Sequence, residues 1–184
     1  LMAYNPSNEG GTAIADVLFG DYNPSGKLPF SYPRTPNGLI TYDHKLFETE
    51  NTSYGNTAFT PQFEFGSGLS YTTFAYSNLQ VSPKTGGTND AVKISVTVTN
   101  TGQRAGKEAV IVYVRDVVAS LSPAGKRVRR FAKISLAPGQ SRTLTFTLRP
   151  ADDLSFIGSD NKPVVEPGEF EVMVGGLKQM FNLQ

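Results

Sequence analysis

The sequence has no cysteine and no tryptophan, and His44 is its only histidine. Because there are no thiols, disulfide frameworks, thiolate nucleophiles and zinc–thiolate centres are all excluded. Long hydrophobic runs are also missing, since no apolar stretch approaches the roughly 20 residues of a membrane-spanning helix. The sequence therefore predicts no cysteine-based chemistry and no membrane partner.

An excess of charge of one sign is lacking as well. The 17 lysines and arginines stand against 16 aspartates and glutamates, which leaves a net charge of +1. So small a net charge argues against binding nucleic acid by bulk attraction. The 12 phenylalanines and 8 tyrosines argue against disorder, and 18 glycines with 12 prolines favour turn-rich β-structure over a helical bundle.

The helix signal of the chain lies within residues 1–33. Ser7 and Asn8 are N-cap residue types, apolar residues follow at helical spacing, and Gly20 is placed to end a helix. These features predict a helix from about Glu9 to Phe19. One helix cannot close a hydrophobic core, so this part of the chain needs a partner surface.

Extended chain and loop are expected between the helix and residue 74. Residues 23–26 (Asn-Pro-Ser-Gly) give a strong turn signal, and prolines at 29 and 33 restrict the next stretch to an edge strand or an extended path. Residues 34–62 are polar and hold no lasting period. A loop of this length is expected to be functional or to lie along another domain. Residues 63–72 follow as an apolar, aromatic run that is punctuated by glycines.

Alternation with a period of two dominates residues 74–184. It is clearest at Val92, Ile94, Val96 and Val98, each separated by a polar residue. Further strands are indicated by apolar residues within 108–114, 134–136, 144–148, 164–165 and 170–174. About six or seven short strands with turns between them, and without a helical segment, predict a mainly β fold, a sandwich of the immunoglobulin or fibronectin type III style.

Two features resemble parts of catalytic or metal sites. Residues 21–26 match the opening of a calcium loop, but Tyr32 stands where the closing bidentate glutamate belongs, so a plain turn is favoured and no metal site is predicted. His44 would serve a Ser-His-Asp triad, yet Asp43 is too close in sequence to orient its ring, and no nucleophile elbow accompanies it. A histidine in a solvated loop is the favoured interpretation.

A basic run covers residues 126–130 (Lys-Arg-Val-Arg-Arg). On a strand, Arg127 and Arg129 would point to one face and the other three residues to the opposite one. Such a run could meet phosphates, but on the edge of a sandwich it also deters pairing with foreign strands. With the near-zero net charge, the second interpretation is favoured, and no nucleic-acid partner is predicted.

Paired carboxylates are the remaining route to catalysis, because glycoside hydrolysis needs two Asp or Glu side chains at a fixed separation. Glu9, Glu48, Glu50 and Glu64 lie outside the expected sandwich. Glu48 and Glu50 lie in a loop with no visible scaffold, and Glu9 lies at a helix start, where the helix dipole alone favours a carboxylate. A structural role is favoured for each of the four.

Several stretches resemble a known family. Residues 8–33 (NEGGTAIADVLFGDYNPSGKLPFSYP) resemble the end of the α/β-sandwich domain of family 3 glycoside hydrolases, and residues 63–72 (FEFGSGLSYT) resemble the linker into its fibronectin type III-like domain. Residues 133–141 (KISLAPGQS) and 165–170 (VEPGEF) resemble signatures of that last domain. Together with residues 42–45 (YDHK), the pattern is most similar to bacterial β-glucosidases.

The resemblance implies a retaining β-glycoside hydrolase acting on β-glucosides or β-glucan oligosaccharides, periplasmic or secreted. In this family the nucleophile is an aspartate on an N-terminal (β/α)8 barrel, and the acid/base carboxylate lies upstream on the α/β-sandwich domain. Neither stretch is in this sequence, so no catalytic, substrate-binding or metal-binding residue is assigned, and no cofactor is expected. The expected partners are these remaining domains of a longer parent, with aromatic residues of 34–62 near the rim of its active site.

The resemblance also implies a division of the chain. Residues 1–33 would be the remnant of the α/β-sandwich domain, 34–73 the long loop and linker, and 74–184 the fibronectin type III-like sandwich. The favoured hypothesis is that this chain braces the catalytic domains of the parent. The alternative is a free-standing module that binds carbohydrate or protein, which would require exposed aromatic rings along one sheet. Hydrolysis by this chain unaided is the least favoured hypothesis.

Overall fold

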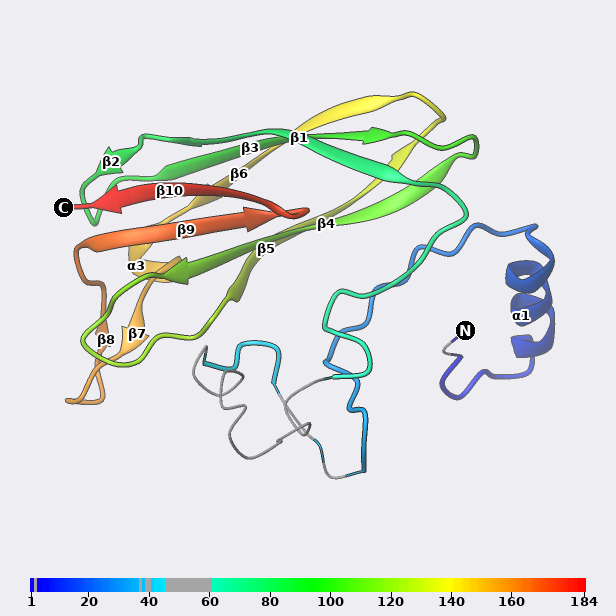
Figure 1. The fold of residues 1–184 in the computed structure, drawn as a ribbon, viewed down its shortest axis with the longest axis horizontal. Coiled ribbons are helices and arrows are strands. Elements are labelled where there is room, and N and C mark those ends of the chain that lie inside the picture. The colour runs from blue at the N-terminus through cyan, green and yellow to red at the C-terminus, as the bar shows by residue number, and fades with distance from the viewer. Residues whose placement is uncertain (2, 37, 39–40, 46–60) are drawn as a thin grey trace.

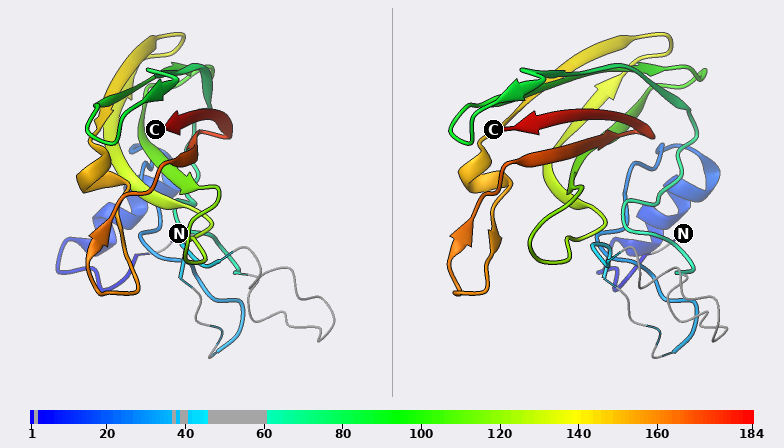
Figure 2. Two further views of the ribbon diagram at one scale, coloured as in Figure 1. Left: turned by 90° about the vertical axis from the view of Figure 1, so that its left-hand side faces the viewer. Right: turned by 60° about the vertical axis from the view of Figure 1, so that its left-hand side comes forward.

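The computed structural model describes residues 1, 3–36, 38, 41–45 and 61–184 (Figure 1). Strands dominate from Phe74 to the C-terminus, whereas the described part of residues 1–73 holds one helix and extended chain. Two sheets lie face to face, as the turned views show (Figure 2). The mainly β class and the sandwich preceded by a helical segment are therefore confirmed.

Helix α1 (Gly10–Phe19) ends as the sequence predicts. Gly20 takes the left-handed conformation, with φ of 88°, which glycine adopts without steric cost. The predicted N-cap was wrong. Glu9 holds that position without a side-chain cap, and Ser7 contributes only its main-chain carbonyl, which accepts the N–H of Gly10 at 2.8 Å. Gly10 is also the helix's only fully buried residue; Ile14, Ala15 and Val17 are half-buried, and Leu18 and Phe19 are exposed.

The proline-bearing stretch after the turn takes an extended path, one of the two predicted outcomes. Its partner is the linker. Leu28 exchanges hydrogen bonds with residues 66–67, and Tyr32 does so with residues 62–63, over N···O distances of 2.7–3.3 Å. Only the bridge between Tyr32 and Phe63 is regular enough to count as β-structure. The N-terminal segment is therefore tied to the chain that leads into the sandwich.

The first sheet has three strands in the order β1 (Phe74–Ser82), β3 (Val92–Asn100), β6 (Ser141–Leu148). The second has five, in the order β2 (Thr85–Gly86), β10 (Leu177–Leu183), β9 (Gly168–Val174), β4 (Gly106–Asp116), β5 (Arg127–Leu136). Neighbouring strands are antiparallel except for the short β2, which runs parallel to β10. Each sheet contributes one face to a shared core.

The core follows from the alternation in the sequence. Successive side chains of a strand point to opposite faces, and the inward positions of β3 are 0–1% exposed. Strand β4, expected to be central, lies between β9 and β5 and sends every second residue inward. The largest fully buried side chains are Phe170, Ile94, Leu136, Leu148, Leu183, Val92, Val96, Val98, Val110, Val112, Val172 and Val174.

Three elements differ from the prediction. A short helix, α3 (Pro150–Asp153), follows β6, so the sandwich region is not free of helix. Strand β8 (Pro163–Val164) pairs with β7 (Phe156–Ile157) in a separate hairpin, and residues 164–165 are therefore not a sandwich strand. Strand β10 follows the predicted last strand. The polar Gln179 in its inward phase hides the alternation that would have indicated it.

We expect Phe170→Ala to lower the free energy of unfolding by about 3–5 kcal/mol, because the substitution removes a fully buried ring from the core. Phe170 is 1% exposed and stacks on Phe181 with ring centroids 5.4 Å apart. The matched control is Phe131→Ala, since Phe131 is 77% exposed on β5 and should cost less than about 0.5 kcal/mol. Denaturant unfolding followed by circular dichroism measures both, and equal effects would contradict this description of the core.

Candidate functional site

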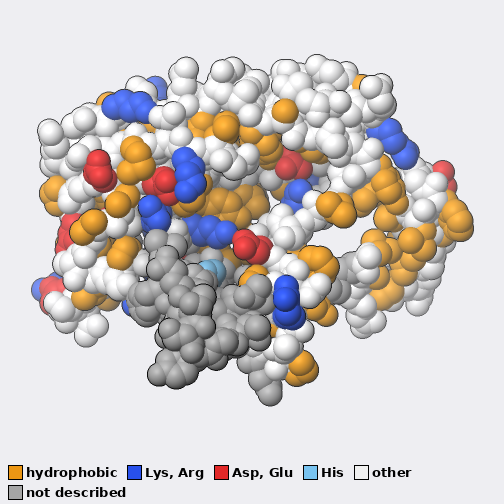
Figure 3. Space-filling model, viewed as in Figure 1, with side chains coloured by type: hydrophobic (Ala, Val, Ile, Leu, Met, Phe, Trp, Pro, Cys, Tyr) orange, Lys and Arg blue, Asp and Glu red, His pale blue; other side chains and the backbone are white. Residues whose placement is uncertain are grey.

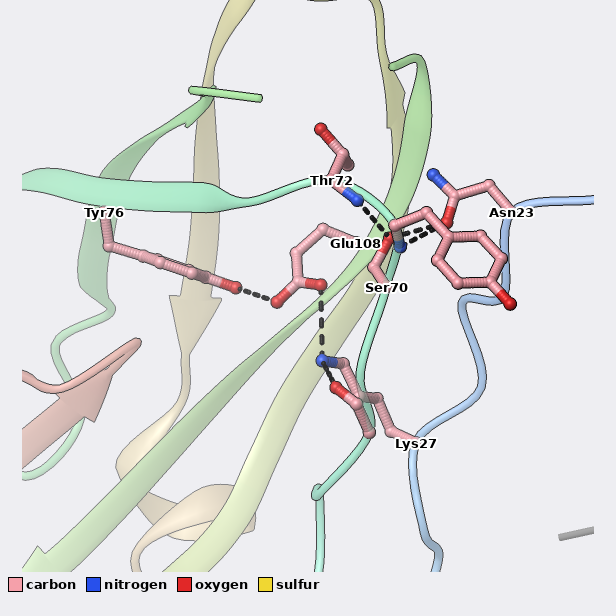
Figure 4. A network of polar contacts seen from close by, with 8 residues as sticks. Asn23, Lys27, Ser70, Thr72, Tyr76 and Glu108 are labelled. Atoms are coloured by element: carbon pink, nitrogen blue, oxygen red, sulfur yellow. Dashed lines mark hydrogen bonds and ion pairs between the residues drawn. The ribbon is translucent and has the colours of Figure 1, made fainter. Parts of the chain in front are cut away.

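The residues with the densest polar contacts lie where the N-terminal segment meets the sandwich (Figure 4). We call this region, formed by residues 20–28, 66–73 and 100–108, the joint. Asn23 is central to it. Its Oδ1 accepts the hydroxyl of Ser70 and the main-chain N–H of Tyr71, both at 2.8 Å, and its Nδ2 donates to the carbonyl of Ala105 at 2.9 Å. One amide side chain thus connects the N-terminal turn, the linker and the loop before β4.

A charged group inside the sandwich adds a second connection. Glu108, on β4, is only 8% exposed. Its Oε1 accepts the hydroxyl of Tyr76 at 2.9 Å, and its Oε2 lies 3.4 Å from Nζ of Lys27, which also donates to the carbonyl of Gly68 at 2.8 Å. Burial, and then the charge of Glu108 and the hydrogen bond to it, raise the pKa of Tyr76 above its usual value. Because a buried carboxylate is costly without partners, Glu108 depends on Lys27.

Asn100, fully buried at the end of β3, organises the sandwich side of the joint. Its Oδ1 accepts the hydroxyl of Thr72 at 2.6 Å and the N–H of Gly102 at 3.1 Å. Its Nδ2 donates to the carbonyls of Arg104 and Leu136, at 2.7 and 3.0 Å. All four hydrogen-bonding positions of the amide are therefore used, which fixes the linker against two strands.

The C-terminal end of α1 is held from the sandwich side. The hydroxyl of Tyr71 donates to the carbonyl of Val17 at 2.6 Å, and the guanidinium of Arg104 donates to the carbonyl of Gly20. The same guanidinium lies 5.6 Å from the centre of the Tyr71 ring. The last carbonyls of a helix lack partners within it, and a cation there is favoured by the helix dipole. The joint therefore fixes the direction in which α1 leaves the sandwich.

A column of aromatic rings anchors the start of the long loop. Tyr42 stacks on Phe65 with centroids 4.5 Å apart, and Phe65 meets the edge of Tyr113 at 6.3 Å. The ammonium of Lys126 lies 5.3 Å from the Tyr113 ring. Burial, followed by the nearby Tyr42 and Glu64, raises the pKa of Tyr113 to about 12. Residues 41–45 are thus held against β4 and β5, while the loop aromatics of residues 46–60 lie outside the described residues.

The two candidates for metal binding and triad chemistry have other partners. Asn23 lies within the calcium-like stretch, and its amide oxygen accepts hydrogen bonds from Ser70 and Tyr71. Nδ1 of His44 lies 2.9 Å from the carbonyl of Thr41, one turn away in its own loop. Within the described residues, no group of three or more His, Asp or Glu side chains could hold a metal ion, and no helix there is long and apolar enough to span a membrane.

The basic run divides between several partners along the edge of the five-stranded sheet. Lys126 precedes β5 and pairs with Glu64 at 3.3 Å. The guanidinium of Arg130 donates hydrogen bonds to both carboxylate oxygens of Asp153, at 2.5 and 2.6 Å. Arg127 and Arg129 line one pocket together, as expected for residues on the same face. The register between β4 and β5 shifts within the run, because Val112 pairs with Arg130 and Tyr113 with Val128, which leaves Arg129 as the extra residue of a bulge in β5.

The four candidate carboxylates do not form a described pair. Glu9 takes the N-cap position of α1, and Glu64 forms its ion pair with Lys126. Glu48 and Glu50 lie outside the described residues. The carboxylate that matters most to the joint, Glu108, was not among the candidates. Its signal was present in the sequence, since Glu108 occupies the same inward phase as Val110 and a charge there requires a partner.

Comparison with known proteins accounts for both parts of this geometry. A family model for the fibronectin type III-like domain matches residues 108–178, and one for the glycosyl hydrolase family 3 C-terminal domain matches residues 1–71. The chain belongs to glycosyl hydrolase family 3. The joint thus lies where the family's C-terminal domain meets its fibronectin type III-like domain.

Relatives of this family 3 chain are similar along its whole length. It is 43% identical over 195 residues to a lysosomal β-glucosidase of Dictyostelium discoideum, covering 100% of this chain and 23% of that protein. It is 42% identical over 185 residues to a periplasmic β-glucosidase of Salmonella typhimurium, covering 95% and 24%. The chain therefore spans about a quarter of the length of the curated relatives it matches.

Solved structures agree with this assignment to family 3. A β-glucosidase from Erythrobacter marinus superposes with a TM-score of 0.86 at 39% identity, covering 95% of this chain and 24% of that one. A β-glucosidase from Listeria innocua in complex with glucose gives 0.86 at 31% identity, covering 97% and 27%. The arrangement of helix, linker and sandwich is shared with these enzymes.

We expect Glu108→Gln to lower the free energy of unfolding by about 1–3 kcal/mol, because it leaves the Lys27 ammonium without its charged partner. Glu169→Gln is the matched control, since Glu169 lies exposed on β9. Denaturant unfolding of both variants, repeated in the Lys27→Met background, measures the coupling. If Glu108→Gln costs the same with and without Lys27, the ion pair does not stabilise the joint.

A pH dependence follows from Tyr113. Its pKa of about 12 in the folded chain exceeds the usual value of 10.0 for a tyrosine. Between these two values the unfolded chain loses the phenolic proton while the folded chain keeps it, so stability falls as pH rises. In Tyr113→Phe this fall should be shallower. Unfolding at pH 8 and pH 11 tests it, and parallel losses in both proteins would contradict the shift.

Proposed function

We propose that this chain is the C-terminal part of a retaining β-glucosidase-like hydrolase, in which its own role is to brace the catalytic domains. The substrate of the parent would be a β-glucoside or β-glucan oligosaccharide. Its remaining domains, a (β/α)8 barrel and the rest of an α/β-sandwich, would be the partners of this chain. The identity to β-glucosidases over almost the whole chain supports this proposal.

One observation carries the structural role. Most of the large exposed hydrophobic side chains lie before residue 74: Leu1, Tyr4, Leu18, Phe19, Tyr22, Phe30, Tyr32, Phe63, Leu69 and Tyr71. Figure 3 shows hydrophobic side chains gathered over α1 and the chain beside it. Exposed apolar clusters of this kind mark interaction surfaces. An isolated helix of this length is also marginal in water, so α1 calls for a surface that covers it.

The proposed division of labour places no catalytic residue on this chain. Residues 1–33 would complete the α/β-sandwich domain, 34–73 would form the loop and linker, and 74–184 the fibronectin type III-like sandwich. The start of β1 at Phe74 supports the last boundary. Glu9 and Glu64 have the structural positions described above, and the catalytic carboxylates would come from the parent's other domains.

The binding-module alternative has less support. Sugars are commonly gripped by flat exposed rings, and in the described sandwich Phe131 is the one large aromatic side chain that is mostly exposed. A single ring on an edge strand provides no platform for several sugar units.

We expect a surface-specific effect from Phe19→Ser. Phe19 is 85% exposed in this chain, so the variant should leave the unfolding of the isolated chain unchanged. The test is a chimera in which this chain replaces the aligned region of the Salmonella typhimurium β-glucosidase. There the ring would be buried, and losing about 1.5–3 kcal/mol of burial should lower the midpoint of thermal inactivation by several degrees.

The control for this experiment is Phe131→Ser, a comparable loss of an exposed ring on the sandwich edge. The unmodified chimera should hydrolyse 4-nitrophenyl β-glucoside, whereas the 184-residue chain alone should not. Equal effects of Phe19→Ser and Phe131→Ser in the chimera, or full protection of residues 1–73 from hydrogen exchange in the isolated chain, would overturn the proposed role.

A further inference from the structure

A pocket of about 460 Å³ lies at the opposite end of β4 from the joint. Its size falls within the range of about 300–1,000 Å³ typical of small-molecule sites. The pocket lies between the end of β4, the loop that follows it, the start of β5 and the β7–β8 hairpin. Most of its surface is apolar. The hydrophobic side chains that line it include Val114, Leu121, Leu154, Phe156, Ile157 and Phe170.

The charged side chains of the pocket are unequal in sign. Lys45, Arg127 and Arg129 face Asp116 as the one acidic group of the lining. Two guanidinium groups on alternate residues of β5 therefore meet in one largely apolar space. Such groups bind carboxylates through paired, charge-assisted hydrogen bonds.

Arg129 takes part in none of the ion pairs of the described residues, although the charge of Asp153 is near enough to act on it. Its Nε is buried and has no acceptor. The neighbouring carboxylate, Asp153, is held by Arg130 through both of its oxygens. Burial, and next the charge of Arg127, lower the pKa of Arg129. Asp153 is therefore engaged by Arg130, and an anion that enters the pocket would give Arg129 a carboxylate partner of its own.

Asp116 does not fill this role. Its Oδ1 is buried without a donor, and the ion pairs of the described residues include none between Asp116 and either arginine. Burial raises the pKa of this carboxyl, and the charge of Glu166 adds to the rise, against a hydrogen bond from the main chain of Val118. A charge on Asp116 would oppose an incoming anion.

We propose that this pocket binds a small organic anion with a flat apolar body, of the aryl carboxylate class. The carboxylate would lie between Arg127 and Arg129, and the ring would lie against Phe156, Leu121 and Ile157. The apolar lining favours this class over a sugar, because a polyol would leave most of the wall without a suitable contact. This site is separate from the joint and from the exposed surface of α1.

The test is isothermal titration of the full 184-residue chain with trans-cinnamate and, as the neutral analogue of the same shape, cinnamamide. Cinnamate should bind at least about tenfold more tightly, because the amide lacks the charge that the guanidinium groups recognise. This comparison uses the unmodified protein, so it does not depend on how any variant folds.

Variants locate the site. Arg129→Gln should weaken cinnamate binding by about tenfold, while Arg142→Gln, an exposed arginine on β6 of the other sheet, should leave it unchanged. Asp116→Asn should tighten cinnamate binding, because it removes the opposing charge. Circular dichroism confirms that each variant is folded.

Four outcomes would overturn the proposal. These are no binding of cinnamate, equal binding of cinnamate and cinnamamide, equal losses in Arg129→Gln and Arg142→Gln, or weaker binding by Asp116→Asn. The last would mean that Asp116 accepts a hydrogen bond from the ligand, as it would from a sugar hydroxyl. Titration with cellobiose separates that case, and binding of cellobiose lost in Asp116→Asn would replace the anion by a sugar.

Discussion

The carboxylate of Glu108 is the constraint on which the association of the two parts depends. It lies inside the sandwich, where an unpaired charge is unfavourable, and the cation that pairs with it, Lys27, comes from the N-terminal segment. The sandwich therefore has a buried group that only the preceding segment neutralises. Tyr76 reaches the same carboxylate from β1. The side-chain amides of Asn23 and Asn100 extend this contact into a network. Their hydrogen bonds to Ser70, Tyr71 and Thr72 fix the position of the linker.

The network also helps to hold in place a helix that has one fully buried residue, Gly10. Arg104 and Tyr71 hold its C-terminal end through main-chain carbonyls, so polar contacts contribute to its orientation. Its apolar side chains remain outside that contact. In the proposed role, this arrangement would orient the helix before another domain covers its hydrophobic surface.

The sandwich was predictable because its strands alternate strictly, and a period of two needs no information from distant residues. Helix α1 and its end at Gly20 were equally local. The joint was not, since it depends on pairs such as Lys27 with Glu108 that lie far apart in sequence. Strand β10 was missed because Gln179 occupies an inward position, and the β7–β8 hairpin because its residues resemble sandwich strands. That the first residues need a partner surface followed from a single helix without a core, and the family resemblance added the kind of domain that this surface was expected to belong to.

Arg130 has a consequence beyond its ion pair. From edge strand β5 it reaches the carbonyl of Thr147 on β6, the edge of the other sheet, as well as Asp153 of α3. One guanidinium thus connects the edge strands of the two sheets. It also occupies a carbonyl that a strand from another molecule would need in order to extend the smaller sheet. Arg130 therefore links the two sheet edges and also hinders the pairing of a foreign strand with β6.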